Sequence, residues 1–283
     1  MKKILVTGAT GFLGSRIVDF YRGKYDVCAP THSELDIVDE KNVFNILNKY
    51  NPDIVIHCAA VSDVGICEKE PEKSNKINVE GSINVARASA IIRARCIVCS
   101  SDQVYFGSSM EGAHKEEEEV QPVNLYGKGK LKAEQECLKV NPDCILLRLS
   151  WMYDIRTIKE GEHGDFFRNL LPKINDISEL YYPIYDKRGI TDVNEVVQNL
   201  EKTFLIPGGV YNFGSPNDRS TFETIYKVFE NVGLSVSRLR KNEEAFKDKP
   251  RNICMCQDKI EKYGVFFSTT VNGLSGNLEK VLK

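Results

Sequence analysis

The sequence lacks long apolar runs, and it lacks an excess of charge of either sign. No stretch of about 18 or more apolar residues occurs in the 283 residues, so no membrane-spanning helix is predicted. Lys and Arg total 38 against 40 acidic residues, and this net charge of −2 gives no reason to expect nucleic acid or an anionic membrane as a partner. Near the N-terminus, Thr7-Gly8 ends the apolar run Ile4-Leu5-Val6 too early for a signal peptide.

Histidine is also scarce. The chain has four histidines and nine scattered cysteines, an odd number, so we predict no metal site. Reduced thiols in a cytoplasmic protein are the simplest interpretation of this cysteine usage.

A glycine-rich turn follows the first predicted strand. Gly8, Gly11 and Gly14 come directly after Ile4-Leu5-Val6. Apolar residues then recur at helical spacing from Leu13 to Tyr21. Glycines in such a strand–turn–helix unit let backbone N–H groups approach a pyrophosphate, which predicts a dinucleotide-binding site.

The end of the second predicted strand, residues 25–30, bears on the choice between NADP and NAD. An acidic side chain there binds the ribose 2′-hydroxyl of NAD, whereas a basic one accommodates the phosphate of NADP. The chain continues as Thr31-His32-Ser33, with no carboxylate before Glu34. The absence of a carboxylate slightly favours NADP, and His32 is expected near the ribose. NAD stays an alternative cofactor because Glu34 follows closely.

Strands alternate with helices through the first half of the chain, with further apolar strands predicted at 53–60, 96–99 and 144–150. The fold class that this alternation predicts is α/β, a doubly wound parallel (Rossmann) sheet, with a smaller C-terminal substrate lobe. We expect residues 1–153 to form the dinucleotide-binding domain, its sheet completed by parts of 186–214. The substrate lobe would comprise 154–185 and 215–283. His57 lies inside a predicted strand, which indicates a core histidine with satisfied hydrogen bonds.

Tyr126 and Lys130 are spaced for one face of a helix, since residues four apart lie one above the other. A phenol loses its proton near pH ~10, and each unit of downward shift requires about 1.4 kcal/mol of preferential stabilisation of the phenolate. An ammonium group one turn away can supply this. The pair therefore has the chemistry of a proton donor to a carbonyl.

Three motifs in this order resemble those of the extended short-chain dehydrogenase/reductases: Thr7-Gly8-Ala9-Thr10-Gly11-Phe12-Leu13-Gly14, Ser100-Ser101-Asp102-Gln103-Val104-Tyr105 and Tyr126-x-x-x-Lys130. Within that superfamily the chain is most similar to the dTDP-4-dehydrorhamnose reductases. Further matching segments are Leu35-Asp36-Ile37, Cys67 to Pro71, Asn78, Pro122 to Gly127, Arg148 to Trp151 and Arg251-Asn252.

The resemblance implies reduction of a nucleotide-linked 4-keto-6-deoxy sugar by NADPH or NADH. Tyr126 would protonate the C4 oxygen, Ser101 would hydrogen-bond to it, and Lys130 would bind the nicotinamide ribose and depress the tyrosine pKa. Asp102, Gln103 and Trp151 would contact the sugar. The expected cofactor-binding residues are Gly8, Thr10, Gly11, Phe12, Leu13, Gly14, His32, Asp36, Ile37, Ala59, Ala60, Asn78, Tyr126 and Lys130.

Two departures from related families bear on the chemistry. Related sugar-nucleotide dehydratases carry a glutamate where this chain has Gln103, and an amide cannot take a proton from carbon, which favours simple reduction. Some reductases place a metal-binding glutamate after the last glycine of the turn. This chain has Gly14-Ser15-Arg16 there, and an arginine repels a cation, so we do not expect the metal site of those reductases in this protein.

Two alternatives stay open. The first is a nucleotide-sugar epimerase on the same fold, and the second is a non-catalytic regulatory subunit of the methionine adenosyltransferase type. A homodimer is compatible with either. Arg188 and Arg251 are candidates to meet substrate phosphates, or they are surface arginines.

Overall fold

The structure is a computed structural model that describes residues 1–108, 110–156, 165–174, 176 and 178–283. The chain divides into two compact units, each assembled from separate segments. The first unit comprises Met1–Val104, Pro122–Arg148 and Val197–Tyr211. The second comprises Tyr105–Gln121, Leu149–Val196 and Asn212–Lys283.

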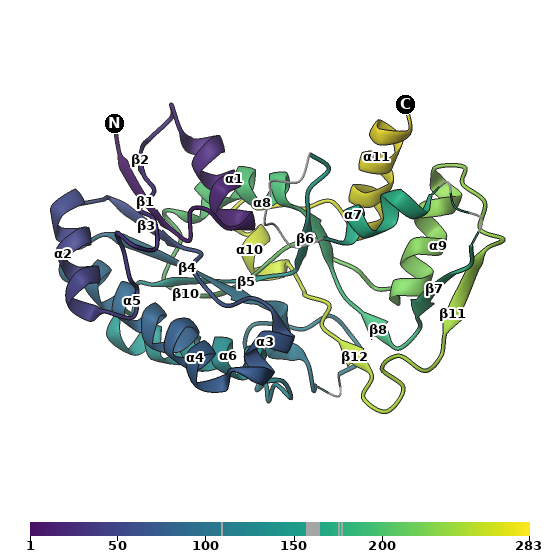
Figure 1. Cartoon of the computed structure of the whole chain (residues 1–283), viewed down its shortest axis with the longest axis horizontal. Helices are drawn as coiled ribbons and strands as arrows, with labels where there is room; N and C mark the ends of the chain where they lie inside the picture. The colour runs from purple at the N-terminus through teal and green to yellow at the C-terminus, as the bar shows by residue number, and fades with distance from the viewer. Residues whose placement is uncertain (109, 157–164, 175, 177) are drawn as a thin grey trace. The chain divides into compact units, whose positions relative to one another are not determined.

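A six-stranded sheet forms the centre of the first unit, in the order β10-β5-β4-β3-β1-β2 (Figure 1). Its strands are β1 (Lys3–Thr7), β2 (Asp26–Cys28), β3 (Ile54–His57), β4 (Arg95–Ser101), β5 (Ile145–Leu149) and β10 (Gly209–Phe213). Strand β1 pairs in parallel with both β2 and β3, and β3 pairs in parallel with β4. The chain thus reverses its direction of winding between β1 and β3, where open α/β sheets bind ligands. The predicted doubly wound parallel sheet is confirmed.

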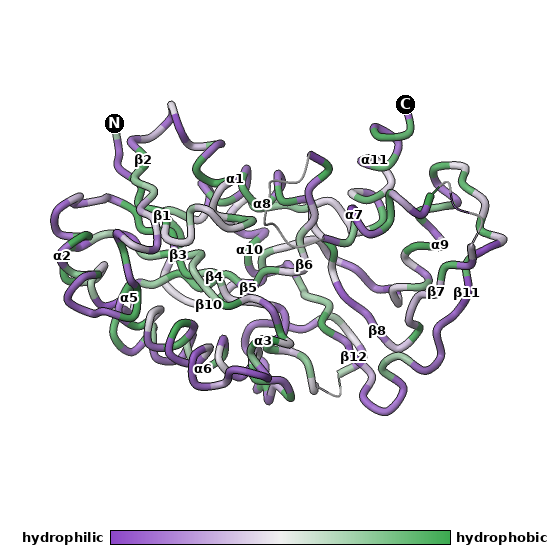
Figure 2. The backbone as a smooth tube through the Cα atoms, viewed as in Figure 1, coloured by the Kyte–Doolittle hydropathy of each residue, from purple (hydrophilic) through white to green (hydrophobic). Residues whose placement is uncertain are grey.

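Helices cover both faces of this sheet. The helical segments of the first unit are α1 (Phe12–Tyr21), α2 (Glu40–Tyr50), α3 (Val64–Lys69), α4 (Pro71–Asn75), the π-helical η1 (Lys76–Gly81), α5 (Ser82–Ile91) and α6 (Leu125–Val140). Alternate residues of the strands, such as Leu5, Val55 and Val98, join the core beneath α2, α5 and α6. On the opposite face, Tyr21 of α1 donates its hydroxyl proton to the Val197 carbonyl. The central strands are accordingly largely hydrophobic in Figure 2.

The second unit is built from short parallel strand pairs and helices. The strand pairs are β6 (Trp151–Tyr153) with β9 (Ile190–Asp192), β7 (Leu180–Pro183) with β11 (Leu239–Asn242), and β8 (Asp186–Lys187) with β12 (Arg251–Asn252). The helices of the second unit are α7 (Phe166–Leu170), α9 (Thr221–Asn231), α10 (Asp258–Glu261) and α11 (Thr270–Leu282). Helix α8 (Val193–Leu200) begins in the second unit and ends in the first. The core of the second unit includes Phe167, Ile225 and Leu274.

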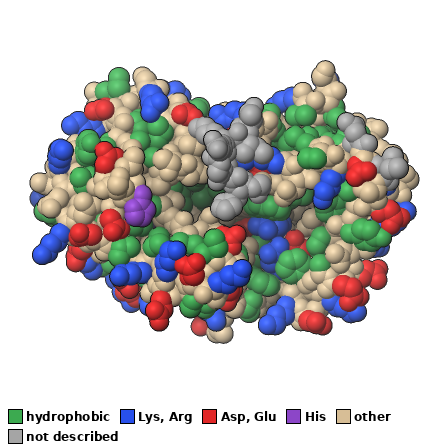
Figure 3. Space-filling model, in the orientation of Figure 1, with side chains coloured by type: hydrophobic (Ala, Val, Ile, Leu, Met, Phe, Trp, Pro, Cys, Tyr) green, Lys and Arg blue, Asp and Glu red, His purple; other side chains and the backbone are tan. Residues whose placement is uncertain are grey.

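The surface carries charges of both signs without a dominant one. Lys and Arg side chains are interspersed with Asp and Glu over the face shown in Figure 3. In the part of the chain that the structure describes, no helix has both the length and the apolar character needed to span a membrane.

Candidate functional site

The glycine turn after β1 is held so tightly that two of its glycines have no room for a side chain. Gly8 has a φ of +64°, and a Cβ there would lie 2.7 Å from the Ala59 backbone nitrogen. A Cβ on Gly14 would lie 2.1 Å from the Gly8 carbonyl oxygen. At Gly11 the nearest atom would be 3.3 Å away, so this position is less restricted. The turn therefore brings backbone, without side chains, to the end of β1.

The N-terminus of α1 has the features of an anion-binding helix end. Gly11 is its N-cap residue and has no side chain to cap the first turn, and that turn contains no acidic residue. Thr10, Phe12 and Leu13, which stay predicted cofactor-binding residues, flank this point. Arg16 donates to the Phe12 carbonyl oxygen (3.1 Å), and its guanidinium lies 4.5 Å from the centroid of the Phe12 ring.

After β2 the chain forms a small exposed turn. The Glu34 carboxylate accepts hydrogen bonds from the backbone nitrogen (2.8 Å) and the hydroxyl (2.9 Å) of Thr31. These bonds lower the pKa of Glu34 and hold its carboxylate against its own turn. His32 is exposed at the tip. The Glu34 carboxylate is thus engaged by its own turn, whereas His32 faces solvent.

The other predicted cofactor residues lie in the segments that follow β2 and β3 and in η1. Ile37 is buried and leaves no space for a side chain on Gly81, whereas Asp36 is exposed. The Asn78 side chain accepts from the Val61 nitrogen (2.8 Å) and donates to the Val61 oxygen (2.9 Å). This pair of bonds fixes the segment after β3 that contains the partly buried Ala59 and Ala60.

Ser101, Tyr126 and Lys130 meet in the first unit, and we call them the Ser101–Tyr126–Lys130 cluster. Asn124 caps α6 by accepting from the Gly127 nitrogen at 2.6 Å, which starts the helix just before Tyr126. Tyr126 lies within reach of a hydrogen bond to Ser101, as the lowering effect of Ser101 on the Tyr126 pKa indicates. The Lys130 ammonium lies 5.7 Å from the centroid of the Tyr126 ring and donates to the Cys99 carbonyl oxygen at 2.8 Å.

Burial sets the protonation of this cluster. Tyr126 and Lys130 are 9% and 5% exposed. Burial raises the pKa of Tyr126 above its ordinary value, and the hydrogen bond to Ser101 opposes that shift only in part. Burial also lowers the pKa of Lys130. Burial therefore keeps Tyr126 as a neutral phenol, and its pKa is raised, whereas the resemblance implied that Lys130 lowers it.

Asp102 and Gln103 are buried next to the cluster. The Asp102 carboxylate accepts from the Ser101 hydroxyl at 3.2 Å. The Gln103 side-chain oxygen accepts from the Asn124 amide at 2.9 Å. Gln103 therefore supports the N-cap of α6.

A buried ion pair behind the cluster was missed by the sequence reasoning. Arg148 of β5 binds the Glu134 carboxylate in bidentate fashion, at 3.0 Å through Nε and 2.7 Å through Nη2. The Ser100 hydroxyl donates to the same carboxylate at 2.5 Å. The signal was in the sequence, because Glu134 lies four residues after Lys130 and continues the face that carries Tyr126.

Trp151, a predicted sugar contact, belongs to the second unit. The Arg188 guanidinium lies 4.6 Å from the centroid of its ring, and Phe166 meets it edge-on at 5.6 Å. Arg251 forms an ion pair with Asp186 at 2.7 Å. The two arginines considered for phosphate binding thus already contact other side chains.

His57 is a core histidine, as predicted. Its Nδ1 is 2.7 Å from the Thr7 hydroxyl, and its Nε2 is 3.1 Å from the Ser82 hydroxyl. Burial lowers its pKa to about 3, so it is neutral. Among the described residues, no three His, Cys, Asp or Glu side chains gather in the manner of metal ligands.

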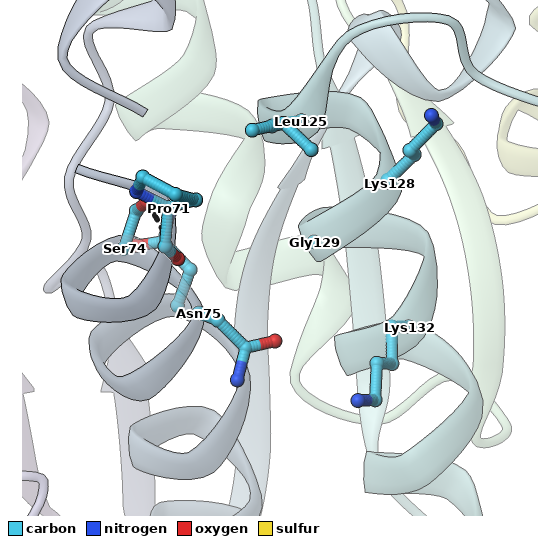
Figure 4. A pocket seen from close by; sticks show the side chains of 8 residues that line it. Pro71, Ser74, Asn75, Leu125, Lys128, Gly129 and Lys132 are labelled. Carbon is cyan, nitrogen blue, oxygen red and sulfur yellow. Dashed lines mark hydrogen bonds between the residues drawn. The ribbon is translucent and has the colours of Figure 1, made fainter. Parts of the chain in front are cut away.

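A small pocket of about 130 Å³ lies between α4 and α6 (Figure 4). Pro71, Ser74 and Asn75 line it from one side, and Lys128 and Lys132 from the other. Tyr126 and Lys130 are not among its lining residues, so this pocket is separate from the cluster.

Known proteins resemble this chain over nearly its whole length. A dTDP-4-dehydrorhamnose reductase of Mycolicibacterium smegmatis is 36% identical over 84% of this chain and 72% of that protein. The methionine adenosyltransferase 2 subunit beta of Xenopus laevis is 29% identical over 93% of this chain and 83% of that protein. The crystal structure of a Bacillus anthracis dTDP-4-dehydrorhamnose reductase in complex with NADP shares the fold, with a TM-score of 0.84, 24% identity and 99% of each chain covered. The family model described as the RmlD substrate binding domain matches residues 1–272. The resemblance predicted from the motifs is confirmed, and this chain belongs to the RmlD substrate binding domain family.

Proposed function

We propose that this protein reduces a nucleotide-linked 4-keto-6-deoxy sugar with NADPH or NADH. The observation that carries the proposal is the Ser101–Tyr126–Lys130 cluster, in which a neutral phenol, a hydroxyl and an amine from distant parts of the chain converge. The M. smegmatis relative is named for this type of reaction, which supports dTDP-4-dehydrorhamnose as the first substrate to test.

The residues present fit a nicotinamide dinucleotide. Gly8 and Gly14 let the turn pack tightly against the end of β1, because a Cβ at either position would collide with backbone atoms, and the first turn of α1 has no acidic residue to repel a pyrophosphate. The engagement of Glu34 with Thr31 favours NADP, because a carboxylate held by its own turn is less available to a ribose hydroxyl. The NADP in the B. anthracis structure supports the same preference.

In the mechanism that we infer, the cofactor supplies the hydride and the protein supplies position and a proton. Tyr126, kept neutral by burial, donates its proton to the C4 oxygen as charge develops there. Ser101 hydrogen-bonds to the same oxygen and to the Tyr126 hydroxyl. Lys130, held by the Cys99 carbonyl, binds the ribose and stabilises the phenolate that remains.

The X. laevis relative favours one alternative of a different class. Its name describes a subunit of methionine adenosyltransferase, so a partner-binding function on this fold is a second candidate. An epimerase would also use the cluster but would return the hydride to the sugar in each cycle.

The test is direct. Purified protein is mixed with NADPH or NADH and a panel of nucleotide-linked 4-keto-6-deoxy sugars, and nicotinamide absorbance is followed. Loss of absorbance with one sugar supports the reductase. No loss with any sugar, combined with stoichiometric recovery of a methionine adenosyltransferase on the tagged protein, would support the second candidate instead.

A further inference from the structure

Two cysteines of neighbouring strands face each other beside the Ser101–Tyr126–Lys130 cluster. His57 of β3 is the register partner of Val98 of β4, so the next residues along the two strands, Cys58 and Cys99, are opposite each other. Side chains of register partners point to the same face of a sheet. The two sulfur atoms are 3.6 Å apart, and both thiols are free.

The geometry is suited to a disulfide. Adjacent strands lie about 4.8 Å apart, which falls within the range of about 4.4–6.8 Å between Cα atoms that a disulfide spans. The sulfur atoms need to approach by about 1.5 Å to reach the bond length of about 2.05 Å. Side-chain rotation of both cysteines supplies this approach.

The environment makes Cys99 the more reactive of the two thiols. A hydrogen bond from the Cys58 thiol lowers the pKa of Cys99, and the nearby Lys130 ammonium adds to this shift. The pKa of Cys58 is raised by the same hydrogen bond and by burial. The Lys130 ammonium is bound to the carbonyl oxygen of Cys99 itself, so its charge lies where it stabilises the Cys99 thiolate. The thiolate is the nucleophilic form of cysteine, so Cys99 reacts first and Cys58 resolves.

A second cysteine pair in this unit provides a contrast. Cys96 and Cys144 are fully enclosed in the core beneath the helices, with exposures of 1% and 0%. Cys58 is partly exposed, and Cys99 is 9% exposed. An oxidant dissolved in water therefore reaches the Cys58–Cys99 pair first.

We propose that Cys58 and Cys99 form a reversible disulfide when a peroxide oxidises the protein, and that this bond weakens cofactor binding. The Cys99 thiolate attacks one peroxide oxygen, the O–O bond breaks, and a sulfenic acid and hydroxide form. The Cys58 thiol then attacks the Cys99 sulfur, its proton goes to the departing hydroxide, and water leaves. Two electrons pass from the sulfurs to the peroxide, and a dithiol reductant reverses the change.

The expected effect follows from what the two cysteines adjoin. Cys99 holds Lys130 through its carbonyl oxygen and lies two residues before Ser101. Cys58 precedes Ala59, whose backbone lies against Gly8. The rotated and bonded cysteine side chains repack against both sides of the predicted cofactor site. The effect on affinity rests on the proposed function, whereas disulfide formation does not.

To test this, reduced protein is treated with hydrogen peroxide, the remaining thiols are alkylated, and the peptides are mapped by mass spectrometry. The affinity for NADPH is measured on the same samples. The expected result is a peptide linking Cys58 to Cys99 and an affinity at least about tenfold weaker, restored by dithiothreitol. Cys256→Ser, which changes a partly exposed cysteine of the other unit, should respond as the wild type does. Cys58→Ser should form no such link, and its NADPH affinity should not fall reversibly after peroxide treatment. Each variant is compared with its own reduced form.

Either of two results overturns the proposal: oxidised wild-type protein without the Cys58–Cys99 link, or the link without a change in affinity. If reduced protein fails to bind NADPH at all, the proposed function fails, and the mapped peptide alone then decides whether the oxidation site exists.

Discussion

The Lys130 ammonium is bound to the carbonyl oxygen of Cys99 at 2.8 Å, which ties the first turns of α6 to the end of β4. Because Ser101 lies two residues further along the chain, this bond helps to hold the amine near the hydroxyl of the Ser101–Tyr126–Lys130 cluster. Tyr126, one turn before Lys130, is positioned by the same helix. The chemistry that we propose depends on this arrangement.

Replacing Tyr126 with phenylalanine should lower turnover by about 10²-fold or more, because the sugar oxygen loses its positioned proton donor. NADPH affinity should stay close to that of the wild type. Steady-state kinetics and a binding titration measure the two effects. Tyr105→Phe removes a buried hydroxyl bound to Asn212 in the second unit and serves as a control for loss of a phenol alone. Wild-type turnover in Tyr126→Phe would exclude the assigned role.

Cofactor binding should weaken at alkaline pH through Lys130 and not through Tyr126. Burial lowers the pKa of Lys130, so its ammonium is lost at a lower pH than in an exposed lysine, whereas the pKa of Tyr126 is raised. NADPH affinity measured against pH should therefore fall on the alkaline side in both wild type and Tyr126→Phe. Lys130→Ala should bind weakly throughout, without that drop. An alkaline drop that vanished in Tyr126→Phe would contradict the assignment.

Breaking the buried ion pair behind the cluster should destabilise the fold. Glu134→Gln removes the carboxylate that binds Arg148, and loss of one partner of a buried pair typically costs about 3–5 kcal/mol. The matched control is Glu136→Gln on the same helix, whose pair with Lys139 is on the surface and should contribute about 0.5 kcal/mol or less. Denaturant unfolding of both variants gives the comparison. An equal loss of unfolding free energy in the two variants would show that the buried pair stabilises the fold no more than the surface pair does.

His57 should make the fold sensitive to acid. Its pKa is about 3 in the folded protein and about 6.5 when unfolded, so the unfolded chain binds the proton first as pH falls. Its contribution is complete above pH ~6.5 and is lost toward pH ~3, at up to about 1.4 kcal/mol per pH unit. Denaturant unfolding across this range should give a shallower slope for His57→Gln. An unchanged slope would mean that His57 is not buried in its neutral form.

Much of the first unit could be predicted from the sequence, because local patterns determine it. The glycines after β1 have no room for side chains, and Tyr126 and Lys130 share a helix face for the reason their spacing indicated. The core role of His57 followed from its place in an apolar strand. The shared helix face and the strand position of His57 require only neighbours along the chain, whereas the crowding at Gly8 comes from the backbone of Ala59.

The remainder depends on contacts between distant segments, which the sequence does not reveal. The approach of Cys58 to Cys99 depends on strand register. The engagement of Glu34 by Thr31 is local, but it depends on a turn geometry that the residue types alone do not determine. Burial of Tyr126 reverses the direction of the pKa shift that its spacing from Lys130 alone implied. The roles assigned to the predicted site residues, and the boundaries proposed for the two domains, stay predictions.

The most direct measurement of the central claim is transfer of deuterium from NADPH that carries deuterium at both C4 positions to dTDP-4-dehydrorhamnose, followed by mass spectrometry of the sugar product. We expect one deuterium in each product molecule with wild-type protein, and product formation about 10²-fold slower or more with Tyr126→Phe. A sugar recovered without deuterium while the protein is folded and binds NADPH would contradict the account.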